Sequence, residues 1–211
     1  MSMFKHSGPR TQRLVKYLKR RSRTPRPGRP QLDCKSYPTL FRKQAIVFTD
    51  TADFTIRTAR DGILHCLMLF EEISNAAIKA IGKEKGDVVK MEGDSLLLRF
   101  PDVGDACRGV IALDAALTRM NRGRPANEQL SFSYGIGYGD VLDLEDDVFG
   151  LEVNLASKIG EDLAKPGEVL LTPAAAAALD AKLLKRVVSY KIVAFEKSAI
   201  PIQRLKLPGR R

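Results

Sequence analysis

Two aspartates stand where apolar, strand-like segments end. Asp50 follows a buried strand in the segment IVFTDTADFT, and Asp94 occupies the turn between two short strands in DVVKMEGDSLLLRF. Either aspartate alone would be an ordinary turn residue, because Asp and Gly-Asp are common in turns. Two of them at the ends of adjacent strands supply acceptor-only oxygens close together, as hard cations require. The two segments together predict a site where two metal ions act on phosphate groups.

From residue 44 onward, the hydrophobic pattern alternates between strand and helix lengths without an internal repeat. Glycines in YGIGYGD, residues 134–140, predict a tight hairpin and close strand contact. Such an alternation is typical of α/β or α+β packing around one sheet. The expected strands are 44–49, 88–91, 96–100, 130–138, 140–144, 168–171, 186–194 and 201–207, and the expected helices are 61–81, 103–120, 149–163 and a small alanine-rich one after 171.

The positive charge lies at one end of the chain. The net charge is +10, but residues 1–43 hold 13 Lys and Arg against the single acid Asp33, which leaves 22 basic and 24 acidic residues beyond. This distribution argues against nucleic acid as a partner of the domain, because only the N-terminal segment would attract it. At 211 residues with 44% apolar content, the rest of the chain suits one buried core.

Residues 1–43 combine a basic stretch with a proline-rich one. We interpret them as a flexible basic extension that precedes a domain at 44–211. As an alternative, residues 14–18 carry an apolar stripe that would suit a short helix on an acidic membrane surface or an acidic partner. An Arg-rich, acid-poor start is also typical of an organelle transit peptide.

The three cysteines are odd in number and widely spaced, which favours free thiols in a reducing compartment. No apolar stretch reaches the length of a membrane span, and the N-terminus lacks the pattern of a secretory signal. These features lead us to expect a soluble, cytoplasmic protein.

A third segment, DVFGLEVNLASK at residues 147–158, completes a pattern that resembles the catalytic domain of class III nucleotide cyclases, from about residue 44 to 207. The resemblance implies a ferredoxin-like, palm-type α/β fold, with a central, mostly antiparallel sheet flanked by helices. It also implies that Asp50 and Asp94 bind two Mg²⁺ or Mn²⁺ ions per site.

Lys90 and Asp147 stand where adenine-specific members of this family carry their base-binding residues. The chemistry agrees, because a lysine donates to the N1 acceptor of adenine and a carboxylate accepts from its N6 amino group. Guanine reverses both groups. The alternative is that Lys90 points outward from a strand and Asp147 belongs to a solvated acidic run.

Asn154 and Lys158 lie four residues apart on an expected helix and hence on one face. In the resembling family the asparagine orients the ribose, and the later position is an arginine that meets transition-state charge. Lysine keeps the charge but loses the planar fork that grips two oxygens. As alternatives, Asn154 is an ordinary helix residue and Lys158 a solvated cation. A further phosphate-binding lysine of the family would correspond to Lys197.

The backbone amides of Thr51, Ala52, Asp53 and Phe54 stand at the expected start of a helix. Unpaired amides at such a position favour anions, so they are candidates to hold the triphosphate. We interpret the Asp53 side chain as structural and not as a third metal ligand.

The combined hypothesis is an adenylate cyclase that converts ATP to cyclic AMP and pyrophosphate. In the resembling family one subunit supplies the metal aspartates and the other the base and ribose residues, which implies a homodimer with two shared sites. One alternative is a cyclase for GTP or a pyrimidine triphosphate. The other is a catalytically weak nucleotide-binding regulatory module, which lysine at position 158 would suit.

Overall fold

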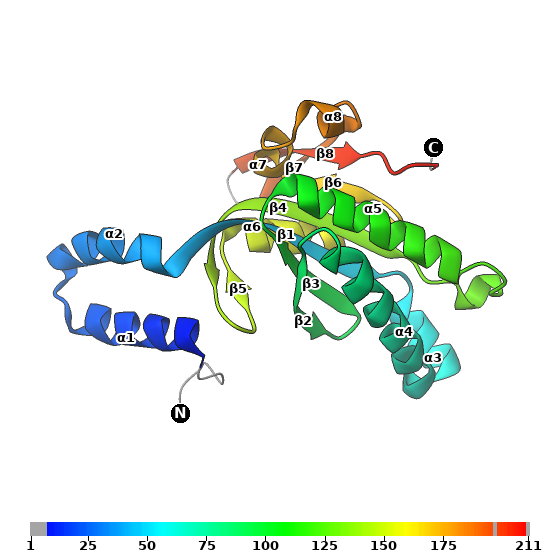
Figure 1. The fold of residues 1–211 in the computed structure, drawn as a ribbon, viewed down its shortest axis with the longest axis horizontal. Helices are drawn as coiled ribbons and strands as arrows, with labels where there is room; N and C mark the ends of the chain where they lie inside the picture. Colours follow the sequence, from blue (N-terminus) through cyan, green and yellow to red (C-terminus); the bar gives the residue numbers. More distant parts are fainter. Residues whose placement is uncertain (1–7, 196–197, 210–211) are drawn as a thin grey trace.

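The computed structural model describes residues 8–195 and 198–209. Within them, helices pack on both faces of a single sheet with strand order β2-β3-β1-β4-β6-β8-β7, and β5 pairs with β4 (Figure 1). The strands are β1 (Phe41–Thr51), β2 (Asp87–Glu92), β3 (Ser95–Phe100), β4 (Phe132–Asp143), β5 (Val148–Phe149), β6 (Val169–Leu171), β7 (Val187–Phe195) and β8 (Ser198–Leu205). The helices are α1 (Pro9–Arg23), α2 (Arg29–Leu40), α3 (Phe54–Asp61), α4 (Ile63–Gly82), α5 (Val103–Met120), α6 (Leu151–Glu161), α7 (Pro173–Ala177) and α8 (Ala181–Leu184), with 3₁₀ turns at Arg26–Gly28 and Ala126–Glu128.

The described sheet is antiparallel throughout except where β4 runs parallel to β6. Strand β1 is central, because it pairs with β3 on one side and along its whole length with β4 on the other. The expected fold class, a mostly antiparallel sheet flanked by helices, is therefore confirmed.

Successive residues of β1 enter two different cores, because side chains alternate between the faces of a sheet. Ala45 and Val47 pack with α4 and α5 in the larger core. Ile46 faces the other way and packs in a smaller cluster with Val153 and Ala156 of α6. The middle of this strand, residues 45–47, is thus buried on both faces of the sheet.

The prediction of a hairpin at residues 130–144 is wrong, because β4 runs through this segment without a turn. Its glycines instead make room for α6. A Cβ atom on Gly135 would lie 2.0 Å from the carbonyl oxygen of Ala156, and one on Gly137 would lie 2.4 Å from that of Glu152. The glycines therefore allow a helix backbone to approach the strand more closely than any side chain would permit.

Residues 9–40 form two helices, where the sequence favoured a flexible extension. Helix α1 carries Leu14 inward, and this residue packs with Leu40 of α2 and Leu144 of the β4–β5 loop. The interaction is long-range, which explains why local composition did not indicate it. Strand β1 also begins at Phe41, three residues earlier than expected. The division into an extension and a catalytic domain at residue 44 stays a prediction.

All three cysteines are free thiols, as expected, with Cys34 exposed and Cys66 and Cys107 buried. In the described part of the chain, no helix has both the length and the apolar character needed to cross a bilayer.

We predict that Gly135→Ala destabilises the protein, because the added methyl group collides with the α6 backbone. Overpacking of this kind typically costs about 1–3 kcal/mol. The matched control is Gly82→Ala at the end of α4, where a Cβ would meet nothing within 4 Å. Thermal unfolding of both variants checks the prediction, and equal melting temperatures for the two would contradict it.

Candidate active site

The two predicted metal aspartates lie at neighbouring strand ends. Asp50 is the penultimate residue of β1, and Asp94 sits in the β2–β3 turn after Gly93, which has a left-handed φ of 60°. Pairing of β1 with β3 brings these ends together. The Thr51 hydroxyl then donates a 2.6 Å hydrogen bond to the backbone carbonyl of Asp94. The sequence thus placed both carboxylates correctly at one edge of the sheet.

The charge of these carboxylates is poorly compensated. Burial, followed by the nearby carboxylates of Asp94 and Glu161, raises the pKa of Asp50 to about 6, against a lowering by a hydrogen bond from Ser95. Burial also raises the pKa of Asp94. Among residues 8–195 and 198–209, no lysine or arginine forms an ion pair with either one. Partly buried, acceptor-only oxygens that lack a cationic partner fit a divalent ion.

The described residues hold no group of three or more potential metal-ligating His, Cys, Asp or Glu side chains. A cation at Asp50 and Asp94 would therefore need further oxygens from phosphates or water. This donor set is the kind that Mg²⁺ accepts, since Mg²⁺ is commonly held by one or two carboxylates together with substrate phosphates.

Lys90 and Asp147 are brought together although 57 positions separate them. The Lys90 ammonium lies 3.2 Å from Asp147 Oδ2 and 3.1 Å from Glu92 Oε2. Burial would lower the pKa of Lys90, but its hydrogen bonds to Glu92 and Asp147 outweigh this effect and raise it. Asp147 is oriented by the amide of Val148, which donates to its Oδ1 at 2.9 Å. One donor and one acceptor thus meet at the rim of a cavity.

That cavity has a volume of about 430 Å³ and lies between β2, β5 and α6. Its polar lining includes Lys90, Asp147, Asn154 and Lys158, so the predicted base, ribose and phosphate residues share one hollow. Its apolar lining includes Phe48, Leu97, Val148, Phe149 and Val153, which suits the flat face of a base.

Sequence reasoning missed two acids of this cavity, Glu92 and Glu161. Glu92 lies two residues after Lys90 on one strand face, and Glu161 lies three residues after Lys158 on one helix face, so periodicity offered a signal. Glu161 also lies close enough to Asp50 to raise its pKa. Lys158 itself pairs with Asp162 at 3.0 Å.

The predicted phosphate-binding amides of residues 51–54 differ in whether they are free to bind an anion. Thr51 ends β1, and the amide of Ala52 donates to the carbonyl of Ser131 at 3.0 Å, so it is already occupied. Asp53 adopts a left-handed φ of 59° before α3 begins at Phe54. The first amides of a helix lack intrahelical acceptors, so the start of α3 keeps the predicted capacity for an anion. Lys197 lies outside the described residues.

No protein-family model matches the chain. A Rhizobium meliloti (strain 1021) protein provisionally named adenylate cyclase 3 is 29% identical over 131 residues, which make up 62% of this chain and 22% of that protein. An adenylate cyclase of Streptomyces griseus is 28% identical over 151 residues, 72% of this chain and 36% of that protein. The match thus spans well under half the length of either relative.

The crystal structure of the adenylyl cyclase CyaB from P. aeruginosa has a TM-score of 0.66 to this chain at 20% identity, over 81% of this chain and 96% of that one. This likeness shows the fold. Together with the sequence relatives, it supports the resemblance of this chain to class III nucleotide cyclases.

We predict that divalent ions stabilise this protein more above pH 6 than below it. The folded-state pKa of Asp50, about 6, exceeds the ordinary value of 3.8, so its contribution to stability is greatest below 3.8 and is lost as pH rises through 6. A bound cation requires the ionised carboxylate and offsets that loss. Melting temperatures with and without Mn²⁺, in the absence of nucleotide, at about pH 5 and about pH 7.5 measure the difference.

The control for this experiment is Asp50→Asn, which keeps the shape but removes the titrating group. Its Mn²⁺-induced shift should be small and should vary less with pH. An equal Mn²⁺ shift at both pH values in the parent protein would show that Asp50 does not bind the ion.

Proposed function

We propose that this chain is an adenylate cyclase that converts ATP to cyclic AMP and pyrophosphate. The observation that carries the proposal is the shared cavity of Lys90, Asp147, Asn154 and Lys158, in a chain that also carries the uncompensated carboxylates Asp50 and Asp94. The names of the two sequence relatives support the same reaction class.

Adenine recognition follows from the pairing of Lys90 with Asp147. Their 3.2 Å contact puts one donor and one acceptor side by side, as the N1 and N6 edge of adenine requires. The base would replace this internal contact with two of its own. Guanine would place a donor against Lys90 and an acceptor against Asp147, and an unsatisfied buried polar group costs about 1–3 kcal/mol.

In the proposed reaction the ribose 3′-hydroxyl gives up its proton to solvent and its oxygen attacks the α-phosphorus. The bond between the α-phosphorus and the oxygen that bridges to the β-phosphate breaks, and pyrophosphate leaves. Asp50 and Asp94 would hold two Mg²⁺ or Mn²⁺ ions, which activate the attacking oxygen and neutralise phosphate charge. Asn154 orients the ribose from the exposed face of α6. Lys158, from the same face, exchanges its contact with Asp162 for the charge that develops on the α-phosphate.

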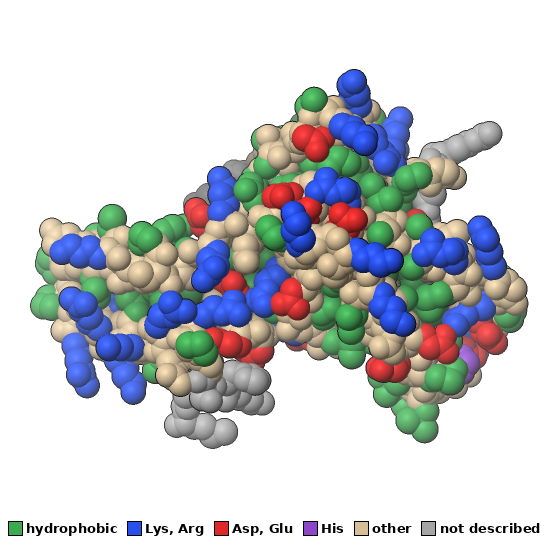
Figure 2. All heavy atoms as spheres, in the orientation of Figure 1, with side chains coloured by type: hydrophobic (Ala, Val, Ile, Leu, Met, Phe, Trp, Pro, Cys, Tyr) green, Lys and Arg blue, Asp and Glu red, His purple; other side chains and the backbone are tan. Residues whose placement is uncertain are grey.

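A homodimer with shared sites is part of the proposal. Class III sites combine metal aspartates of one subunit with base and ribose residues of the other, and this chain carries both sets. Hydrophobic side chains gather at the outer end of α3 and α4 (Figure 2), and an exposed apolar patch of this kind often marks an interface. Its exposed members are Ile56, Ile63, Leu64, Leu67 and Met68.

One observation favours a second candidate, a catalytically weak nucleotide-binding module. Lys158 stands where the family carries arginine, and its ammonium is engaged by Asp162 on the surface. A cyclase for GTP or a pyrimidine triphosphate would be distinguished from the adenylate cyclase and from the weak module by the cyclic nucleotide that it forms. Cytoplasmic location, and an acidic partner or membrane surface for the basic N-terminal segment, also stay predictions.

We predict that Asp50→Ala and Asp94→Ala each abolish cyclisation, because phosphate charge is left uncompensated. Mixing Asp50→Ala with Asn154→Ala subunits should recover activity from two inactive parents, since one of the two sites in the mixed dimer is then complete. Cyclic AMP formation by verified mixed dimers is the measurement. Turnover by both aspartate variants would refute the metal assignment, and inactive mixed dimers would refute the shared site.

We predict that Lys158→Ala lowers the rate of cyclisation much more than it weakens ATP binding, by about 10²–10³-fold in turnover. Lys158→Arg should retain or increase the rate, because the planar guanidinium grips two oxygens. Steady-state kinetics with ATP separate the two effects. Asp162→Asn is the matched control, since it frees Lys158 without removing it. An unchanged turnover in Lys158→Ala would identify this lysine as a solvated cation.

A further inference from the structure

The β4–β5 loop, residues 144–147, touches two distant parts of the protein. At its far end, Asp147 pairs with Lys90 in the cavity. Two residues earlier, Glu145 contacts the first turn of α1. The N-terminal end of α1 faces this loop in Figure 1. A single short loop thus lies between the N-terminal helices and the proposed base-binding pair.

Glu145 forms the cap of α1. Its carboxylate accepts hydrogen bonds from the Arg10 amide at 2.6 Å, the Thr11 amide at 3.0 Å and the Thr11 hydroxyl at 2.6 Å. Burial would raise the pKa of Glu145, but these hydrogen bonds lower it to about 2. Gly8 closes the contact, since a Cβ there would lie 2.3 Å from Glu145 Cδ. The helix start is therefore seated directly on the carboxylate, where helix polarity favours a negative charge.

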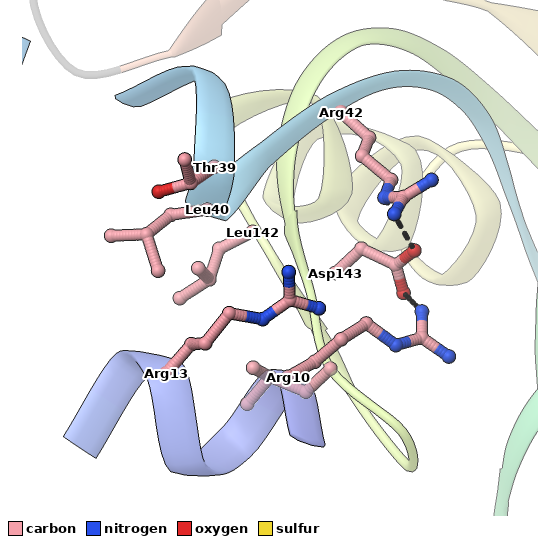
Figure 3. Close-up of a pocket in the computed structure, with 8 residues that line it drawn as sticks. Arg10, Arg13, Thr39, Leu40, Arg42, Leu142 and Asp143 are labelled. Carbon is pink, nitrogen blue, oxygen red and sulfur yellow. Dashed lines mark ion pairs between the residues drawn. The ribbon is translucent and has the colours of Figure 1, made fainter. Parts of the chain in front are cut away.

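Arginine side chains that converge on one buried carboxylate strengthen the same junction (Figure 3). Arg10 and Arg42 converge on Asp143, the last residue of β4, whose side chain is only 3% exposed. Arg99 reaches Asp143 at 2.6 Å and also binds Asp87 at the start of β2, the strand that carries Lys90. Both halves of the base-binding pair are thus connected to this junction.

The loop between the two contacts is short and closed. The amide of Leu144 donates to the carbonyl of Asp147 at 2.9 Å, so residues 144–147 form a hydrogen-bonded turn. Leu144 is buried against Leu14 of α1. A shift of Glu145 therefore shifts the backbone of Asp147, with one residue between them.

We infer that Glu145 is a positioning residue for nucleotide recognition: by binding the first turn of α1, it holds the 144–147 turn so that the Asp147 carboxylate faces the base cavity. The effect of Glu145 on nucleotide recognition rests on the proposed function, whereas the mechanical coupling of α1 to the loop does not. The N-terminal helices then act on the affinity for the base and not on the chemical step.

The test compares Glu145→Ala with the parent, using ATP as the probe. We expect KM for ATP to rise about three- to tenfold, because the hydrogen bonds of Glu145 to α1 are lost, with little change in kcat. Thr11→Val should act in the same direction but less. In an Asp147→Ala background, Glu145→Ala should have almost no further effect, because coupled residues are not additive. Lys19→Ala, which removes an exposed charge from the same helix, is the control and should match the parent.

Amide hydrogen exchange without nucleotide supplies a readout that does not depend on cyclase activity. Glu145→Ala should speed exchange both in residues 9–13 and in residues 144–149, and Lys19→Ala should change neither. An unchanged KM, an equal effect in the Asp147→Ala background, or a loop that exchanges at the parental rate would each overturn the inference. If the parent makes no cyclic nucleotide, the proposed function fails, and exchange alone decides the coupling.

Discussion

The contact between α6 and β4 determines where the proposed catalytic groups lie. The helix rests on glycines, with space for a Cβ atom at neither Gly135 nor Gly137. Glu152 holds the start of the helix, because its carboxylate accepts from the Tyr138 amide at 3.1 Å and from the Thr172 hydroxyl at 2.6 Å. With its inner face fixed in this way, α6 turns Asn154 and Lys158 towards the cavity that Lys90 and Asp147 border. Close backbone packing is thus what gathers residues from three parts of the sequence.

In the part of the chain that the structure describes, the carboxylates of the proposed metal site lack the cationic partners that a buried carboxylate elsewhere in the protein has. Asp143, nearly fully buried, is met by arginines from α1, β1 and β3. Asp50 and Asp94 are partly buried and have no such cation among the described residues, so burial and mutual repulsion raise the pKa of Asp50. An uncompensated acidic pair costs stability, and perturbed carboxylates of this kind concentrate at functional sites. A divalent cation bound between Asp50 and Asp94 would reduce this loss of stability.

Local sequence patterns predicted much of this architecture. The helix expected at 103–120 has those bounds in the structure, and the strands that end near Asp50 and flank Asp94 were correctly placed. The glycine-rich part of β4 was misinterpreted, because glycine serves a turn and a close helix contact equally well. The helices at 9–40 depend on contacts such as Thr11 with Glu145, 134 positions away, which no local pattern encodes. Helix periodicity could have placed Glu161 on the face of Lys158, but its approach to Asp50 depends on how α6 crosses the sheet.

The central claim is that this chain carries both a cavity suited to adenine and a pair of carboxylates suited to divalent ions. The most direct measurement identifies the products when the purified protein is offered ATP, GTP, CTP and UTP separately, each with Mg²⁺ and with Mn²⁺. The account predicts cyclic AMP and pyrophosphate from ATP, at a higher rate than any cyclic product from the other three, and none without a divalent ion. No cyclic nucleotide from any substrate, or a preference for GTP or a pyrimidine triphosphate, would contradict it.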